Sequence, residues 1–435
     1  MVVEKGGIMM KIKNNKNVGL VLLGLLCSFV ALMHASPSNE ICPSPLPKHY
    51  KHAQAGNIVA AYVANWDVSG AHQFKIESIE KVAPQLTHIM YAFMKPDDQT
   101  GTCKPSDNLV DIGAVNEVQD PIIGGNFAEL LKLKKKFPHL KILLSIGGGI
   151  YNKSFITIAQ DPKLLKKFTQ SCVDILDFYD HTFTNPIDQS VQTTHFTYKG
   201  LFDGLDIDWE WSGKKLTPEL SQIFTKFIHD LKHLLHARDR KTKKKSTLAV
   251  ALQVTPHVYK TLDLHALSKD VDLFNVMAYD FYGPYNETIG FNAPVCGKWS
   301  VYSIDGALQR IMELGVSPEK MVLGLPLYGH VYENTDGYNS KIGKKDKIRS
   351  VAYRVIKNKY MDNPDFKESW HDHGQVPSLY SSKHRTFVSH DEEQSLTKKV
   401  EFAKMKKLQG VFLWRLPCDD EQFSMLKVVS DAMKE

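Results

Sequence analysis

The sequence predicts an α/β fold, a closed (β/α)8 barrel of the TIM class with a small α+β insertion between its seventh and eighth strands. Eight short apolar runs rich in β-branched residues recur along the chain, and amphipathic stretches separate several of them. Apolar strands that alternate with amphipathic helices indicate a parallel sheet covered on both faces. Eight such strands within about 360 residues favour closure into a barrel. No Gly-x-Gly-x-x-Gly turn follows the first run, as a dinucleotide-binding sheet would require.

The predicted elements follow one another in regular order. Strands are expected at residues 58–63, 86–93, 141–146, 202–208, 247–254, 273–278, 321–327 and 410–416. Helices are expected at residues 127–137, 162–179, 218–236, 304–314 and 396–408. Enzymes with this fold build their active sites at the C-terminal ends of the strands, so candidate functional residues are sought there.

One interval between strands is too long for a single βα unit. About 80 residues separate the seventh and eighth strands, whereas about 30 to 40 suffice for a connection through one helix. We therefore predict an inserted lobe at residues 330–392. Its aromatic residues indicate a packed core of its own: Tyr332, Tyr353, Tyr360, Phe366, Trp370 and Tyr380.

The N-terminus carries the features of an export signal. Residues 1–17 contain four lysines and one glutamate, residues 18–33 are almost wholly apolar, and Ala35 and Ser36 are small. This order is typical of a secretory signal peptide, and about 16 apolar residues are too few to span a bilayer. We expect a signal peptide at 1–35, a lead-in at 36–56 and the barrel at 57–435. The protein is then secreted, extracellular or periplasmic, without a stable membrane span; a permanent N-terminal anchor is the alternative.

Composition and charge exclude several classes of protein. Apolar residues make up 43% of the chain and charged residues 23%, so the chain as a whole is neither disordered nor fibrous. The net charge of +6 over 435 residues is too small for a strongly basic nucleic-acid-binding protein. Beyond the predicted signal peptide lie Cys42, Cys103, Cys172, Cys296 and Cys418. Their odd number and wide spacing indicate neither a disulfide framework nor a zinc site, although one or two bridges remain open.

Three acidic residues share one face of the fourth predicted strand. Residues 202–211 read FDGLDIDWEW, so Asp206, Asp208 and Glu210 follow one another at steps of about 6.6 Å. Their mutual repulsion and their burial both oppose ionisation. Glu210, nearest the C-terminal end, is therefore a candidate general acid at neutral pH. The alternatives are a site for a divalent cation and a polar, water-filled barrel mouth.

The same segment resembles the DxxDxDxE signature of the family 18 glycoside hydrolases, the chitinases and their relatives. Asp203, Asp206, Asp208 and Glu210 occupy its four acidic positions. Further motifs resemble the family in chain order, between about residues 57 and 420: Ser145-Ile146-Gly147-Gly148, Met277-Ala278-Tyr279-Asp280, Tyr91-Ala92-Phe93 and the aromatic residues Tyr62, Trp66 and Trp414. The predicted lobe corresponds to the chitinase insertion domain of this family.

The resemblance implies a catalytic apparatus. In this family the glutamate protonates the glycosidic oxygen and the N-acetyl group of the substrate attacks the anomeric carbon, so no protein carboxylate acts as nucleophile. Glu210 is implied as the acid and then the base, Asp208 as the residue that orients the acetamido group, and Asp206 as its proton-sharing partner. Tyr279 is implied as a hydroxyl donor to the acetamido oxygen. Neither a metal nor a cofactor is implied.

The resemblance also implies the substrate-binding residues Tyr62, Trp66, Phe93, Gly148, Trp209, Met277, Asp280 and Trp414. Trp414 is expected beneath a sugar ring. Asp203 has the opposite parity to the other acids and is expected to support its strand. The chain departs from the family at Gly149, Ser212 and His330, where relatives often have an aromatic residue, a proline and an arginine.

We expect a monomeric, secreted chitinase that hydrolyses β-1,4-linked N-acetylglucosamine with retention of configuration. Chitin or its oligosaccharides are the expected partner, and no nucleic acid is expected. The alternatives are a chitin-binding lectin on the same fold and an endo-β-N-acetylglucosaminidase acting on glycoprotein glycans. Lectin-like relatives typically replace the acid glutamate, so the presence of Glu210 favours an enzyme. The run Trp370-His371-Asp372-His373 is too short to be more than a weak indication of a metal site.

Overall fold

A computed structural model describes residues 42–69, 73–113, 123–184, 189–211, 216–297 and 302–435. The chain divides into two units, Met1–Cys42 and Pro43–Glu435, and the second contains the elements described below. The predicted signal peptide at residues 1–35 lies outside the described residues. Cys42 and Cys296 are each disulfide-bonded, whereas Cys103, Cys172 and Cys418 are free.

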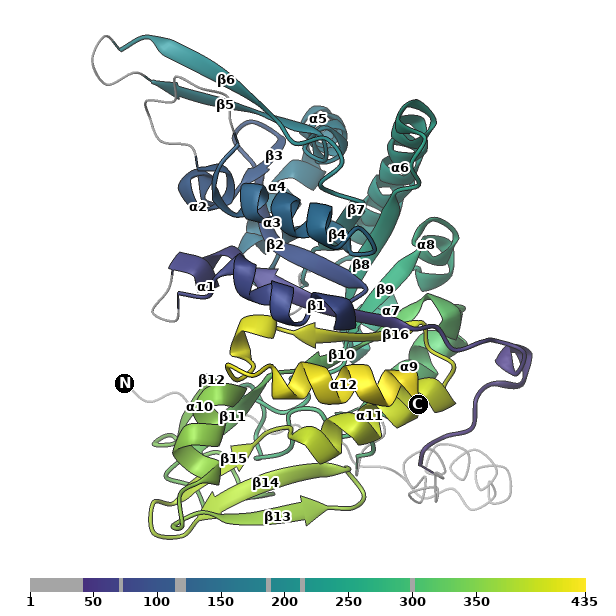
Figure 1. Cartoon of the computed structure of the whole chain (residues 1–435). Coiled ribbons are helices and arrows are strands. Elements are labelled where there is room, and N and C mark those ends of the chain that lie inside the picture. The colour runs from purple at the N-terminus through teal and green to yellow at the C-terminus, as the bar shows by residue number, and fades with distance from the viewer. Residues whose placement is uncertain (1–41, 70–72, 114–122, 185–188, 212–215, 298–301) are drawn as a thin grey trace, which may run out of the picture. The chain divides into compact units, whose positions relative to one another are not determined.

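A closed barrel of eight parallel strands forms the centre of the second unit (Figure 1). The strands are β1 (Ile58–Ala64), β2 (His88–Asp97), β4 (Lys141–Gly147), β7 (Gly204–Asp208), β8 (Thr247–Gln253), β9 (Leu273–Met277), β10 (Met321–Pro326) and β16 (Gly410–Trp414). Each pairs with the next, and β16 pairs with β1, so all eight predicted strands and the predicted barrel are confirmed. Apolar side chains including Ala60, Leu143 and Phe412 fill the interior. A short strand, β3 (Thr102–Pro105), is added antiparallel to β2.

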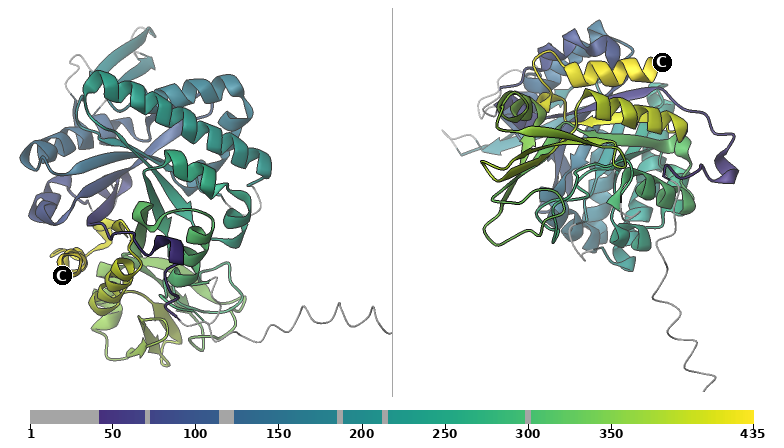
Figure 2. Two further views of the ribbon diagram at one scale, coloured as in Figure 1. Left: turned by 90° about the vertical axis from the view of Figure 1, so that its right-hand side faces the viewer. Right: turned by 90° about the horizontal axis from the view of Figure 1, so that it is seen from below.

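Helices lie on the outer side of the barrel (Figure 2). They include α1 (Asn65–Ser69), α2 (Asn108–Ile112), α3 (Gly125–Lys136), α4 (Asn152–Gln160), α5 (Pro162–Asp174), α6 (Pro218–Thr242), α7 (Pro256–Thr261), α8 (Leu264–Asp270), α9 (Ile304–Glu313), α11 (Glu393–Met405) and α12 (Ser424–Lys434). The sequence sets their ends locally: the Thr217 side chain caps α6, and Pro218 is its first residue. Within the described residues, no helix combines the length and the apolar character that crossing a membrane requires.

The helix predicted at residues 162–179 is wrong in its last turns. α5 ends at Asp174, and β5 (Phe178–Thr184) and β6 (Val191–Thr197) form an antiparallel hairpin beyond it. These strands are rich in threonine and aromatic residues, which favour extended backbone, but they directly adjoin a helical run that hides the boundary. Figure 1 shows the hairpin projecting near β3 and α5.

The predicted lobe contains a five-stranded antiparallel sheet in the order β12-β11-β15-β14-β13. Its strands are β11 (Tyr328–Glu333), β12 (Lys347–Ala352), β13 (Lys367–His371), β14 (Val376–Ser381) and β15 (Thr386–Ser389), with α10 (Tyr353–Ile356) after β12. Apolar side chains alternate between its two faces: Tyr332 and Phe387 join one buried cluster, whereas Val331 and Val388 join another. The sheet begins at Tyr328 rather than at residue 330.

Where β13 meets the start of α11, Glu368 raises the pKa of Glu392. Burial and the negative charge of Glu368 bring this pKa to about 7. Because Glu392 has a higher pKa in the folded protein than in the unfolded one, its protonation stabilises the folded protein. This stabilisation is complete below about pH 4.5 and is lost as the pH rises through 7. We expect Glu368→Gln to raise the free energy of unfolding at pH 8 by about 1 kcal/mol after solvent screening, and to change it little at pH 5. Thermal unfolding at both pH values measures the difference. Equal changes in the free energy of unfolding at both pH values, or the same pH dependence in the exposed control Glu77→Gln, would contradict this prediction.

Candidate active site

Asp206 is anchored by side chains from three other strands. Its carboxylate accepts hydrogen bonds from the Tyr62 hydroxyl at 2.8 Å, the Ser145 hydroxyl at 2.7 Å and the Asn275 amide at 3.0 Å. These donors come from β1, β4 and β9, and Asp206 is fully buried. Burial raises the pKa of Asp206, and the three hydrogen bonds oppose that rise. Asp206 is therefore held in one position at the core of the barrel.

Asp208 is less constrained than Asp206. Its buried atom Oδ1 has no hydrogen-bond partner among the described residues. Burial first, and then the negative charges of Glu210 and Asp206, raise its pKa well above the ordinary value. The acids titrate together, so a proton here belongs to the group rather than to one residue. Asp208 lines a cavity at the barrel mouth, and the hydrogen-bonding capacity of its Oδ1 is not used by the described residues.

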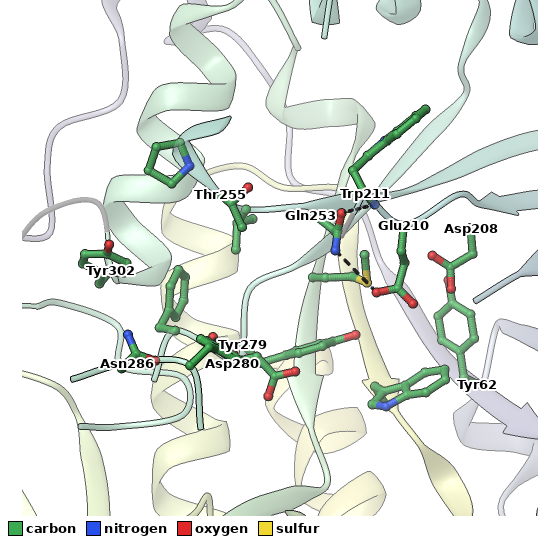
Figure 3. Close-up of a pocket in the computed structure, with 16 residues that line it drawn as sticks. Tyr62, Asp208, Glu210, Trp211, Gln253, Thr255, Tyr279, Asp280, Asn286 and Tyr302 are labelled. Carbon is green, nitrogen blue, oxygen red and sulfur yellow. Dashed lines mark hydrogen bonds between the residues drawn. The ribbon is translucent and has the colours of Figure 1, made fainter. Parts of the chain in front are cut away.

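Glu210 lies at the end of the acidic row, directly after β7, with its carboxyl facing the same cavity (Figure 3). Burial raises its pKa, the Gly149 N–H lowers it by hydrogen bonding, and the charge of Asp280 raises it further. The Gln253 amide lies 3.5 Å from Oε2. A side chain at Gly149 would bring its Cβ within 3.1 Å of Oε1, so Gly149 lies directly against the carboxyl group. A carboxyl with a raised pKa at a cavity wall can act as a general acid.

Tyr279 and Asp280 follow β9 on another side of the cavity. Figure 3 shows the Tyr279 ring extending toward Glu210. Burial, together with the charges of Asp208 and Asp280, raises the pKa of Tyr279 well above its ordinary value, so its hydroxyl stays a donor. Asp280 accepts hydrogen bonds from the Tyr328 hydroxyl at 2.6 Å and from His330 Nε2 at 2.9 Å. The lobe strand β11 therefore fixes a carboxylate whose charge acts on Glu210.

Aromatic side chains form a continuous wall from the cavity outward. The Trp414 ring lies 5.2 Å from that of Tyr62 and stacks on that of Phe93 at 6.0 Å. Phe93 in turn lies 5.7 Å from Trp66, which is 41% exposed. The Arg415 guanidinium lies 5.3 Å from the Trp66 ring centre. Trp414 lines the cavity and Trp66 is exposed, so these two rings can face the C–H surfaces of sugar rings, whereas Phe93 is buried.

The cavity has a volume of about 670 Å³ and brings most of the predicted site residues together. Tyr62, Asp208, Glu210, Met277, Tyr279, Asp280 and Trp414 line it. Phe93 and Trp66 are not among its lining residues, although the Phe93 ring stacks on that of Trp414. Gly148 lies against Phe93, where a side chain would bring its Cβ within 2.6 Å of the ring. The volume lies in the range of small-molecule sites, about 300 to 1,000 Å³.

Trp209 is not brought to this cavity. It is buried, its indole N–H donates to Asn152 Oδ1 at 3.0 Å, and its ring stacks on Phe155 at 4.9 Å. Its parity on the strand, opposite to that of Asp208 and Glu210, explains this outward orientation. Asp203 also has the opposite parity and does not line the cavity. It accepts a hydrogen bond from the Ile142 N–H at 2.7 Å and pairs with Lys134. Asp203 thus supports the strand, as its parity predicts.

Several lining residues were not predicted from the sequence: Trp211, Gln253, Thr255, Tyr285, Asn286 and Tyr302. Gln253 ends β8, and the rule that sites form at the C-terminal ends of strands would have found it. Tyr328 and His330 bond to Asp280 from the lobe, a contact between segments about 50 residues apart that spacing does not reveal. Among the described residues, no group of three or more His, Cys, Asp or Glu side chains is arranged to hold a metal ion.

Comparison with known sequences gives one family over most of the chain. The model of glycosyl hydrolases family 18 matches residues 58–419. The chain is 24% identical to Chitinase A1 of Niallia circulans over 86% of its own length, but it spans only 58% of that protein. It is 25% identical to Probable chitinase 2 of Drosophila melanogaster, with 92% of this chain and 78% of the relative covered.

Solved structures show the same fold. The chitinase ChiA74 from Bacillus thuringiensis superposes with a TM-score of 0.73 at 23% identity, covering 87% of this chain and 70% of the other. Human YKL-39, described as a pseudo-chitinase with retained chitooligosaccharide binding, superposes with a TM-score of 0.69 at 22% identity, covering 87% of this chain and all of the other. The same barrel thus serves both a chitinase and a pseudo-chitinase.

Proposed function

Because the chain belongs to the family 18 glycosyl hydrolases, we propose that it is a secreted chitinase that cleaves β-1,4-linked N-acetylglucosamine with retention of configuration. One observation carries the proposal: Glu210, Asp208 and Tyr279 line one cavity, with a raised pKa on both carboxyl groups and an unpartnered oxygen on Asp208. This set supplies an acid, a hydrogen-bond acceptor and a hydroxyl donor at one place.

In the proposed mechanism, Glu210 donates its proton to the oxygen of the scissile bond as that bond breaks. The acetamido carbonyl oxygen of the substrate attacks the anomeric carbon from the opposite face, forming a cyclic intermediate. Asp208 accepts the acetamido N–H and stabilises the positive charge that develops on this group. Tyr279 donates its hydroxyl to the acetamido oxygen and fixes the direction of attack. Glu210 then removes a proton from the water that opens the intermediate.

A chitin-binding lectin is the main alternative, because YKL-39 shares the fold and binds chitooligosaccharides. The presence of Glu210 at the cavity wall favours turnover over binding alone, since lectin-like relatives typically replace the acid glutamate. An endo-β-N-acetylglucosaminidase would need the same acid. The cavity-lining ring of Trp414 and the exposed ring of Trp66 favour an extended chain of sugar rings.

A product analysis tests the proposed function. The full chain is incubated with chitohexaose and, separately, with a high-mannose glycopeptide, with and without EDTA, and the anomers formed first are recorded by NMR. We expect chitooligosaccharides in the β-configuration and no effect of EDTA. Binding without turnover would support the lectin instead, and cleavage of the glycopeptide alone would support the endoglycosidase.

We expect the charge of Asp280 to contribute to the alkaline limit of activity. Catalysis requires protonated Glu210, so the rate falls as the pH rises through the pKa of Glu210, which burial and Asp280 both raise. We expect Asp280→Asn to lower that pKa and to move the alkaline limb of kcat/KM to lower pH by about 0.5 to 1 unit. The exposed lobe residue Asp336 provides the control Asp336→Asn. An alkaline limb that stays in place in Asp280→Asn would disprove the coupling.

A further inference from the structure

Two free cysteines lie next to each other where β3 packs on α5. Cys103 is on β3 and Cys172 is in the last turn of α5, and neither lines the active-site cavity. The Cys172 thiol lies within hydrogen-bonding range of the Cys103 thiol. Both side chains are buried, with 3% and 0% of their surfaces exposed. The fold therefore brings together two thiols that lie far apart along the chain.

Backbone contacts fix the distance between β3 and α5. The Cys103 N–H donates to the Ser171 hydroxyl at 2.8 Å, and this hydroxyl donates to the Phe168 carbonyl at 2.8 Å. At Gly101, in the turn before β3, a Cβ atom would lie 3.2 Å from the Cα of Leu164, so the two backbones also approach closely at the start of α5. Pairing with β2 holds the other side of β3. Close approach of the two backbones is the first requirement for a disulfide bond.

The surroundings of the two cysteines disfavour the thiolate form. Burial raises the pKa of the Cys172 thiol well above its ordinary value, and the neighbouring Cys103 and the negative charge of Asp174 raise it further. A buried thiol that stays protonated is a poor nucleophile. A bond between these cysteines therefore forms while the chain folds, before the two thiols are buried, and the folded protein then shields it from reductants.

We propose that Cys103 and Cys172 form a disulfide bond when the chain folds in an oxidising compartment. The two thiols transfer two protons and two electrons to a disulfide of low molecular mass or of another protein, which is reduced to two thiols. Because Cys42 and Cys296 are each disulfide-bonded, the folded chain already requires an oxidant of this class. The proposal does not depend on activity toward chitin.

The bond closes a loop that carries part of the active site. The chain between the two cysteines contains α2, α3, β4 and α4. Ser145, which bonds to Asp206, and Gly149, whose N–H bonds to Glu210, lie in this loop. Closing a long loop stabilises a protein chiefly by restricting the unfolded chain. The disulfide therefore protects this segment against thermal unfolding without contacting a catalytic group.

Peptide mapping tests the proposal directly. The full chain is folded in a buffer of reduced and oxidised glutathione, then unfolded, alkylated and digested without reduction. We expect mass spectrometry to recover a cross-linked peptide that contains Cys103 and Cys172 and is two hydrogen atoms lighter than the two reduced peptides together. Recovery of these cysteines mainly as alkylated thiols, or bridged to other cysteines, would overturn the proposal.

Thermal unfolding with and without a reductant measures the effect on stability. The reductant should lower the unfolding temperature of the wild type by about 3 to 5 °C more than that of Cys103→Ser/Cys172→Ser, because the double variant has no such bond to lose. Each protein is compared with itself, so the cost of burying serine cancels. Cys418→Ser removes the other buried free thiol and should respond as the wild type does. An equal response of the wild type and the double variant would refute the bond, whether or not the protein hydrolyses chitin.

Discussion

Glu210→Gln is expected to lower kcat on chitohexaose by about 10²- to 10⁴-fold, the range that a general acid contributes. Glutamine keeps the size of the side chain and its hydrogen bond to a donor, but it has no proton of suitable acidity. The Gly149 N–H and the Gln253 amide, which both lie beside the carboxyl, hold the replacement in nearly the same place. The effect should therefore fall on kcat, with KM changed by no more than about threefold.

Steady-state kinetics and thermal unfolding of the purified variants measure this outcome. Glu219→Gln, an exposed glutamate in the first turn of α6, is the matched control and should match the wild type. A lower unfolding temperature of Glu210→Gln would attribute the loss to folding. Turnover within a factor of three of the wild type in a folded Glu210→Gln protein would remove Glu210 as the acid.

Much of the barrel could be predicted because its strands are buried on both faces. Such strands must be apolar over their whole length. The eight strands can therefore be recognised in the sequence without knowing which strands pair with one another. The hairpin β5–β6 escaped prediction because its strands are mostly exposed and carry no apolar alternation. Its boundary with α5 depends on tertiary contacts such as the 3.0 Å hydrogen bond from the Tyr198 N–H to the Asp177 carbonyl.

The candidate site was predictable wherever the residues lie on one strand. Alternation alone places Asp206, Asp208 and Glu210 on one face, and it also sets Trp209 apart from them, although the family resemblance suggested otherwise. Contacts between distant segments were not predictable. The bonds from Tyr328 and His330 to Asp280 depend on how the lobe packs against the end of β9.

Asp208→Asn is expected to lower kcat by about 10²- to 10³-fold while leaving the fold intact. Atom Oδ1 of Asp208 is buried without a partner among the described residues, so the fold does not depend on a hydrogen bond to this atom. Asparagine keeps an acceptor oxygen but loses the charge that stabilises the positive intermediate. Because burial and two neighbouring acids disfavour ionised Asp208, its removal should leave the unfolding temperature equal or higher.

Asp206→Asn is the discriminating comparison, because the two substitutions are chemically identical. The Asp206 carboxylate accepts hydrogen bonds from Tyr62, Ser145 and Asn275, and the NH₂ group of an asparagine would face at least one of these donors. We expect Asp206→Asn to lower both the unfolding temperature and kcat, whereas Asp208→Asn lowers kcat alone. Calorimetry and kinetics on the two proteins separate them. A matching loss of stability in both would mean that Asp208 is part of the structural network, and its direct role toward the substrate would fall.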